Sequence, residues 1–584
     1  MADRYWVGGT GNWDGSTTTN WSASSGGAGG ASVPTSADNV FFDANSDAGG
    51  TFTVTLTTTA NCLDLTVSGL DNTMTFAGTS ALNVYGSLSY PATNFSHTRT
   101  GTTTFRATSS KTITTNGISF GGTVSFNGVA GQWTLQDDFT GTASGSNTLV
   151  NGTLALNDKT LSLQRFSLTG TSTKVISFST SGVINLTTSS AATALDFSGT
   201  TGFSWTGTPS FTFNPTYAGT NTITFDFSGA YFTESTALNV YSNGSPATAV
   251  ANAITLPTGT KTYFLQFNGS YKDIDFTYNG NSVIGINCAA DNFIYGNLKL
   301  PVGVTTSGST SRRTTLASTS SGKVISLNGA SWTAALDING IGGTWTFGSA
   351  VATQGNEPSF QIINGSVNAS TYSLTCSNGC SITNDSLTMG DGALSASNVT
   401  VSASKQLTLG SGGVTLTGNS GTIWSIPSSS TFSAGTSNIT TTSTSISAKA
   451  FAGGSKTYNK VTFGGATGIT TFTITGNNTF SEFATIKTVA STFTFTAGTT
   501  QTVGKFTVRG NVAKLITLNS STPTSTYTLS ASSGIIDSNY LSIQDSIATG
   551  GAIWYAGINS TNAGNNTGWI FESATAGNFI HFFV

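Results

Sequence analysis

The most informative property of this 584-residue sequence is its lack of charge. Charged residues make up 8% of the chain, against about 25% in an ordinary globular domain, and they nearly cancel to a net charge of −3. Binding to nucleic acid or to anionic membranes relies on a strong positive charge, so the overall balance argues against both. We therefore expect no nucleic-acid partner and no insertion into a membrane.

Helix-forming residues and proline are also scarce. Only four Glu occur, and the bulk of the chain is Thr, Ser, Gly, Asn, Val and Phe, a composition that disfavours helices and suits strands. Seventy Gly with only 10 Pro and no Gly-x-y period exclude collagen. Since 37% of the residues are hydrophobic, the chain can bury a core, and we expect an all-β protein.

Targeting signals and cysteine clusters are absent as well. The N-terminal residues contain no apolar stretch behind a basic one, and no run approaches 18 apolar residues, so we expect neither a signal peptide nor a membrane helix. Of four cysteines, Cys62 and Cys288 stand alone in strand-like contexts. Cys376 and Cys380 could close a small loop or supply half of a metal site, but no second Cys/His pair lies nearby to complete it. Structural thiols, with no metal and no cofactor, are the expectation.

Alternation of apolar and small polar residues dominates the apolar parts of the chain. It predicts short, half-buried strands separated by Gly, Asn and Ser clusters. The clearest examples are Phe52-x-Val54-x-Leu56, Leu63-x-Leu65-x-Val67, Ile223-x-Phe225-x-Phe227 and Phe493-x-Phe495.

Internal repetition indicates how these strands are arranged. The segment 124–135, VSFNGVAGQWTL, returns as 336–347, LDINGIGGTWTF, and Asn151-Gly152 returns as Asn364-Gly365 with almost the same spacing. Repeated strand–turn units cannot bury a face alone and must stack, which predicts an elongated right-handed parallel β-helix, or β-solenoid, with about 22 residues in each coil.

Asn-Gly pairs favour a competing arrangement. They occur at 116, 127, 268, 279, 328 and 339, in couples 11 residues apart, and Asn-Gly is a strong hairpin signal. Local hairpins would favour tandem β-sandwich modules, which stay as the alternative fold.

Both ends of the chain carry recognisable motifs. The opening YWVGGTGNWD (5–14), NWS (20–22) and VPTSADNVFFD (33–43) resemble a module of tailed-bacteriophage virion proteins, tail fibre-like β-solenoids, and of bacterial surface β-solenoid adhesins. The closing GIIDSNYLSIQDS (534–546), WYAG (554–557) and NNTGWIF (565–571) are similar to the end of the same group. Because the bacterial members usually carry a signal peptide and a sorting domain, the resemblance leans toward the phage form.

This resemblance implies a virion structural protein, a tail fibre or spike that attaches to the host surface, and it transfers no catalytic motif. It implies a location in the virion, with other virion proteins, a homo-oligomer (a trimer favoured) and a host cell-surface glycan as partners. A capsid-attached head fibre and a bacterial adhesin stay as alternatives. The expected divisions are a module for attachment or capping at 1–50, a shaft at 51–460 with related blocks near 118–186 and 323–402, a distal solenoid at 461–533 and a cap at 534–584.

A polysaccharide depolymerase on a phage spike is the enzymatic alternative, since glycoside hydrolysis needs two nearby carboxylates. Asp273 and Asp275 are the weak catalytic candidates because they share one face of a strand, and a solvated polar face is the plainer interpretation. Asp137 and Asp138 are adjacent and should point to opposite faces. The two histidines, His97 and His581, lie outside any nucleophile motif; a surface loop and a tail are expected, and we do not expect an enzyme.

The tryptophans could stack on sugars, but their positions favour packing. Trp133 and Trp345 are equivalent in the repeat, and spaced sets occur at both ends. Repeat or cap positions are therefore expected for Trp6, Trp13, Trp21, Trp133, Trp345, Trp554 and Trp569.

Overall fold

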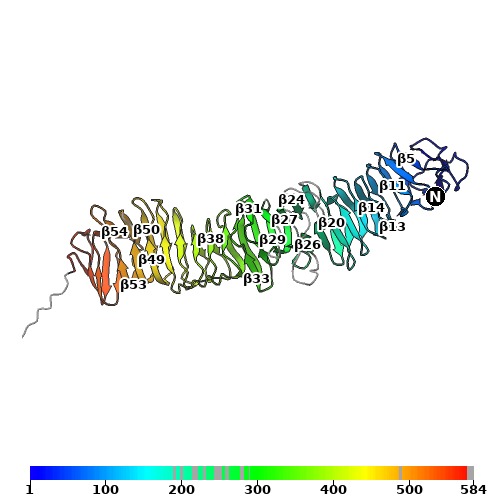
Figure 1. Ribbon diagram of the computed structural model, residues 1–584. Helices are drawn as coiled ribbons and strands as arrows, with labels where there is room; N and C mark the ends of the chain where they lie inside the picture. Colours follow the sequence, from blue (N-terminus) through cyan, green and yellow to red (C-terminus); the bar gives the residue numbers. More distant parts are fainter. Residues whose placement is uncertain are drawn as a thin grey trace, which may run out of the picture. The chain divides into compact units, whose positions relative to one another are not determined.

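The computed structural model describes residues 1–188, 192–197, 202–213, 221–227, 232–242, 253–256, 262–276, 282–288, 290–485 and 489–574. These residues form strands and turns and no helix. Parallel strands stack into a β-solenoid of about 21 turns, which confirms the expected fold class (Figure 1). The chain divides into two compact units, Met1–Tyr295 and Gly296–Val584, and this boundary lies inside the segment 51–460.

In the first unit each coil contributes strands to parallel stacks. The first stack contains β4 (Asn39–Phe42), β7 (Leu65–Val67), β10 (Leu88–Ser89), β13 (Ser110–Thr114), the second halves of β14 (Val124–Leu135) and β16 (Asn147–Ala155), β19 (Lys174–Ser177) and β22 (Phe203–Thr206). The second contains β6 (Ala60–Cys62), β9 (Leu82–Val84), β12 (Thr103–Phe105), the first halves of β14 and β16, β18 (Phe166–Leu168), β21 (Ala192–Asp196), β24 (Asn221–Asp226), the first half of β27 (Thr262–Asp275) and β28 (Ser282–Cys288).

Two further stacks complete these coils. One contains β2 (Gly11–Trp13), β5 (Phe52–Leu56), β8 (Met74–Gly78) and β11 (Phe95–His97), and the other contains β15 (Phe139–Gly141), β17 (Thr160–Leu163), β20 (Val183–Leu186), β23 (Ser210–Phe213), β26 (Ala253–Leu256), β25 (Leu238–Ser242), the second half of β27 and β29 (Asn292–Ile294). At the N-terminus, β1 (Asp3–Trp6) pairs antiparallel with β3 (Trp21–Ser22) and parallel with β4.

The second unit contains three stacks over most of its coils. The first includes β30 (Leu298–Lys299), β33 (Lys323–Ser326), the second halves of β35 (Ala335–Phe347) and β37 (Phe360–Asn368), β40 (Ser386–Thr388), β43 (Gln406–Thr408) and β46 (Thr431–Ser433). The second includes β32 (Arg313–Leu316), the first halves of β35 and β37, β39 (Cys380–Ile382), β42 (Val399–Val401), β45 (Gly421–Ser425), β48 (Lys449–Ala452), β50 (Thr471–Thr475), β52 (Ser491–Phe495), β54 (Ile516–Ser520), β57 (Leu541–Ile543) and β60 (Thr561–Asn562).

The third stack of this unit runs from Ser331 to Gly550. It contains β34 (Ser331–Trp332), β36 (Val351–Thr353), β38 (Leu374–Cys376), β41 (Leu394–Ala396), β44 (Val414–Leu416), β47 (Asn438–Thr441), β49 (Thr457–Phe463), β51 (Thr479–Thr485), β53 (Thr500–Thr507), β55 (Tyr527–Ala531) and β58 (Ser546–Gly550). A short stack, β56 (Ile535–Asp537), β59 (Ile553–Tyr555) and β61 (Trp569–Ile570), lies at the C-terminal end, and β31 (Thr305–Gly308) lies near the start of the unit.

Register and burial explain why the coils stack. Leu374 pairs with Leu394 and Leu394 with Val414, so branched aliphatic side chains recur every 20 residues and form a buried apolar column. The alternate residues, mostly Thr and Ser, face outward along the same strands. A single coil could not cover its inner face, so neighbouring coils supply most of the burial that stabilises each one.

The Asn-Gly pairs that favoured hairpins mark corners between parallel strands instead, so the β-sandwich alternative is wrong. Asn127-Gly128 lies within β14 and Asn339-Gly340 within β35, at the point where each long strand passes from one stack to the next. The Asn364 amide donates to Asn339 Oδ1 at 2.7 Å, which joins the corners of consecutive coils. A Cβ on Gly340 would lie 1.8 Å from the Ser318 carbonyl oxygen, so this corner requires glycine. The Asn-Gly pair at 279 lies outside the described residues.

Candidate functional site

In the pairing of β27 with β25, the catalytic candidate Asp273 lies within a register irregularity between Tyr271 and Ile274, and Asp275 lies just after it. Ile274 and Phe276 point into the core, as expected, but Asp275 is only 3% exposed. The expected solvated face is therefore wrong for Asp275: this carboxylate is covered, and the pair does not present two carboxylates to a bound polysaccharide.

Asp137 and Asp138 accept hydrogen bonds from two different neighbouring coils. Asp137 accepts hydrogen bonds from the backbone N–H and the hydroxyl of Thr115 in the preceding coil, at 2.8 and 3.2 Å. Asp138 accepts from the backbone N–H of Thr160 in the following coil at 2.8 Å. The Asp158 carboxylate accepts from the backbone N–H of Ser181 at 2.8 Å and from the Thr180 hydroxyl at 3.0 Å. These hydrogen bonds lower the pKa of Asp158 to about 2. These aspartates satisfy backbone donors at coil corners, a structural use of their charge.

His97 contradicts the expected surface loop. It ends β11, where it contacts the rings of Phe76, Tyr90 and Phe120, and both of its ring nitrogens are buried without a well-formed hydrogen bond. Burial, together with the neighbouring Arg99 guanidinium, lowers the pKa of His97 to about 4, so the imidazole is neutral near pH 7. These ring contacts include no Ser, Thr or Cys side chain, and burial raises the pKa of the Tyr90 hydroxyl well above its usual range. His581 lies outside the described residues.

All four cysteines are free and buried. Cys376 and Cys380 lie on successive strands, β38 and β39, and the hydrogen bond between the two thiols and then burial raise the pKa of Cys380 well above its usual range. Protonated thiols are poor metal ligands and poor nucleophiles. Across the described part of the chain, no cluster of three or more His, Cys, Asp or Glu side chains could hold a metal ion.

The tryptophans expected at repeat or cap positions are all buried. Trp133 and Trp345 are 0% and 1% exposed and lie at equivalent places in β14 and β35, as the repeat predicts. The two ends of the chain hold the others: Trp6, Trp13 and Trp21 at the N-terminus, and Trp554 and Trp569 at the C-terminus, each 8% exposed or less.

These end clusters cover the terminal coils. The Trp21 ring lies 5.1 Å from both Trp6 and Trp13 in edge-to-face contacts, and Trp13 in turn lies 6.4 Å from Phe76 of the next coils. At the other end, Trp554 and Trp569 are 5.1 Å apart. Such contacts seal apolar ends, so these rings are not available to stack on a ligand.

Trp205 is the exception among the ten tryptophans. Its ring is partly exposed and is stacked on Phe232 at 4.7 Å. Phe232 covers one face of this ring and Phe203 contacts it edge-to-face at 5.5 Å, so only the remaining surface is open to a ligand. Sequence reasoning did not single it out, because nothing in its neighbourhood distinguishes it from the buried tryptophans.

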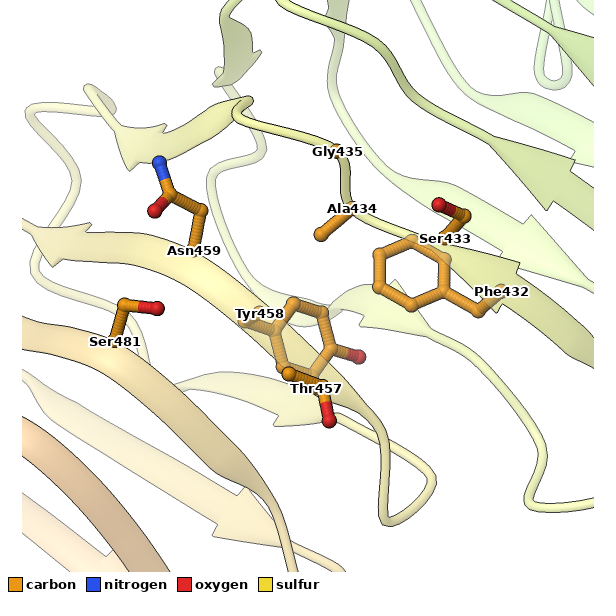
Figure 2. Close-up of a pocket in the computed structure, with 8 residues that line it drawn as sticks. All are labelled: Phe432, Ser433, Ala434, Gly435, Thr457, Tyr458, Asn459 and Ser481. Carbon is orange, nitrogen blue, oxygen red and sulfur yellow. The ribbon is translucent and has the colours of Figure 1, made fainter.

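One surface hollow lies where the first stack of the second unit ends (Figure 2). Phe432 and Ser433 belong to the last strand of that stack, β46, and Tyr458 belongs to β49, which pairs with β47 and β51 instead. The hollow measures about 370 Å³, and Thr457, Asn459 and Ser481 add polar groups to its wall. It thus results from a change in the cross-section of the solenoid.

The chemistry of this hollow suits neutral polar ligands. Its base is the partly exposed ring of Phe432, which lies 5.0 Å from the fully buried ring of Tyr458, while hydroxyl and amide groups surround it. The Tyr458 hydroxyl already donates to the Gly453 carbonyl at 2.8 Å and burial raises its pKa, so it is not an acid at neutral pH. Sugar hydroxyls match this combination of apolar base and polar rim.

A second hollow, of about 420 Å³, lies at the Asn-Gly corners of β35 and β37. Its polar groups include Asn364, Asn384 and Asp385, and Ile341 projects beside them with 76% of its surface exposed. A third, of about 400 Å³, lies between β53 and β56. All three are shallow, and none encloses a pair of carboxylates.

Within the residues that the structure describes, no helix is long and apolar enough to cross a membrane. Comparison with known proteins places the chain in no group: no protein-family model, no curated protein and no solved structure matches it.

Proposed function

We propose that the chain is a structural protein of a bacteriophage virion, a tail fibre or spike that attaches to the host surface. The observation that carries the proposal is that the two motif-bearing segments, 5–43 and 534–571, close the ends of a β-solenoid with buried tryptophan clusters. In each unit, stacked coils with hydroxyl-rich surfaces suit a protein that presents shallow sites to a glycan. Attachment is better supported than polysaccharide cleavage, because Asp275 is buried.

The proposed partners follow from the same role. The chain is a homo-oligomer, with a trimer favoured, and joins other virion proteins in the particle, because several copies multiply weak glycan contacts into firm attachment. Residues 1–50 are the favoured anchor.

The anchor is best tested on its surface. Deleting residues 1–50 would remove Trp13 and Phe42, which contact the core residue Phe76, and would expose the first coils. Tyr5 and Phe41 instead form a stacked, partly exposed pair with ring centroids 4.7 Å apart. Replacing both with Ser should prevent incorporation into particles while the chain stays folded.

Attachment itself is tested by competition. Purified chain added to host cells should reduce adsorption of the particles in proportion to the fraction of receptors occupied, and polysaccharide extracted from those cells should prevent binding of the labelled purified chain to the cells. Unchanged adsorption at saturating chain, or release of reducing sugar from that polysaccharide, would contradict attachment without cleavage.

A further inference from the structure

The nearly neutral overall charge conceals a basic segment. Between residues 392 and 536 the sequence contains eight Lys and Arg but only one acidic residue, Glu482, a net charge of +7. The rest of the chain then carries −10. Such segregation in a chain with 8% charged residues creates a local positive potential that the total of −3 does not indicate.

Some of these cations have internal roles. Lys449 is buried, and its ammonium donates to the Ser445 and Ser447 carbonyls at 2.8 and 3.1 Å. Lys456 donates to the Ser428 and Ser430 carbonyls at 2.7 and 2.6 Å. These two therefore hold coil corners together, and the outward charge comes from other residues.

The outward charges form a row across three consecutive coils. Lys460 of β49 lies in register with Glu482 of β51, which lies in register with Lys505 of β53. Lys460 pairs with Glu482 at 3.1 Å, and Thr507 donates to the same carboxylate oxygen at 3.0 Å. Burial alone would raise the pKa of Glu482, but these two contacts outweigh it and lower that pKa. The only acidic residue of the segment is therefore already paired.

The row leads into the hollow between β53 and β56. Lys505 and Arg509 lie on one wall, with Asp537 and Ile535 on the other, and the hollow measures about 400 Å³. Arg509 and Asp537 form an ion pair at 3.2 Å, but both side chains are more than half exposed, so water screens the pair and a ligand can replace it. Ile535, 60% exposed, adds an apolar surface beside the two cations.

We propose that this row and hollow bind an acidic polysaccharide, with Lys505 and Arg509 holding its carboxylates. The proposal rests on the attachment function proposed above and names the class of glycan. Adjacent strands are about 4.8 Å apart, so Lys460 and Lys505, two strands apart, are separated by about 10 Å. The strand spacing is close to the length of one sugar in an extended chain. An acid on every second sugar therefore places one carboxylate at Lys505 and Arg509, an uncharged sugar beside Glu482, and the next carboxylate near Lys460, whose ammonium Glu482 already contacts.

Other polyanions fit this surface less well. Single-stranded nucleic acid needs exposed aromatic rings on which bases stack, and the exposed large side chains near the row, Val512, Ile535 and Ile553, are aliphatic. Duplex DNA needs a denser array of cations than two lysines about 10 Å apart. Alternating Thr and Ser around the row instead provide hydroxyl partners for sugar hydroxyls.

The test compares matched glycans and matched variants of the full chain. The probe is hyaluronate, which carries a carboxylate on every second sugar, and its control is carboxyl-reduced hyaluronate, the same backbone without charge. The site variant is Lys505→Gln with Arg509→Gln. The control variant, Arg312→Gln with Lys323→Gln, removes one Lys and one Arg from outside the basic segment of the same unit.

Hyaluronate should bind the unaltered chain more tightly than its reduced form, and more weakly as salt rises from about 0.05 to 0.5 M, because ions screen exposed charges. The site variant should bind about tenfold more weakly, and the control variant about as well as the unaltered chain. Melting curves should show that both variants fold.

Equal binding of the two probes, an unaffected site variant, or tighter binding to duplex DNA than to hyaluronate would overturn the acidic-glycan proposal. If the chain still competes with particles for host cells in that case, attachment stands and only the class of glycan is wrong. If hyaluronate binds through Lys505 and Arg509 but the chain does not compete, attachment falls and the glycan site stands.

Discussion

Acidification from pH 7 to pH 5 should destabilise the first unit through one buried side chain, His97. In the folded chain the pKa of His97 is about 4, because burial among aromatic rings and the nearby Arg99 disfavour the imidazolium. In the unfolded chain it returns to about 6.5. Because the pKa of His97 is lower in the folded state, the unfolded state takes up the proton first as pH falls. The contribution of neutral His97 to the free energy of unfolding is therefore complete above about pH 6.5 and is lost as pH falls toward 4.

The size of the loss follows from the two pKa values. At pH 5 the unfolded chain is almost fully protonated at this position and the folded chain is not, which costs about 2 kcal/mol of unfolding free energy relative to pH 7. Aspartates whose pKa is lowered, such as Asp158, change stability only below about pH 4, outside this window. Between pH 7 and 5 the loss should therefore depend on His97.

Two measurements check this. Urea unfolding at pH 7, 6 and 5 should show the loss in the unaltered chain and a much flatter profile in His97→Phe, which keeps a ring in the aromatic cluster. Selective labelling of histidine gives only two imidazole signals, since the chain has two His, and the signal missing from His97→Phe should titrate near pH 4. Titration of that signal near pH 6.5, or equal pH dependence in the variant, would refute the reasoning.

Further predictions concern the corners, the repeat and the thiols. Gly340→Ala should lower the unfolding free energy by about 3 kcal/mol or more, because its Cβ would lie 1.8 Å from a carbonyl oxygen. Gly413→Ala is the control: its Cβ would lie 3.8 Å from the nearest atom, so it should cost less than about 1 kcal/mol. Equal urea midpoints for the two variants would contradict this. Trp133→Phe and Trp345→Phe should each cost about 1 to 3 kcal/mol, with effects that add in the double variant since the two lie in different units; a large cost at only one would show that the sites differ. All four thiols should resist a thiol reagent in the native chain and react once it is unfolded in urea, and rapid native labelling would show that they are accessible.

The fold could be predicted because its information is local and repeated. Alternation such as Phe52-x-Val54-x-Leu56 specifies strands with one buried face, and the duplicated 124–135 and 336–347 segments require those strands to stack. The Asn-Gly pairs misled, because a turn residue predicts a change of direction but not which strand follows it in space. At 127 and 339 the residues on both sides of the corner pair in parallel with neighbouring coils, and they do not fold back antiparallel on each other.

The surface was harder to predict than the core. His97 follows Phe95 by two residues, so the alternation indicated a buried position, but the polar neighbours Ser96 and Arg99 suggested a loop. The net charge of the whole chain does not indicate the basic segment, because acidic residues elsewhere more than cancel it. Which cations face outward depends on coil geometry: Lys449 is buried and Lys505 is exposed, and composition alone does not distinguish them.

The central claim, that the chain is an external component of a phage particle, is tested most directly by imaging. Gold-labelled antibody raised against the purified chain should decorate the outside of phage particles propagated from the genome that encodes it, and the chain should be found by mass spectrometry in those purified particles. Particles that carry neither the label nor the chain, while the same antibody detects the protein elsewhere in the culture, would contradict the account.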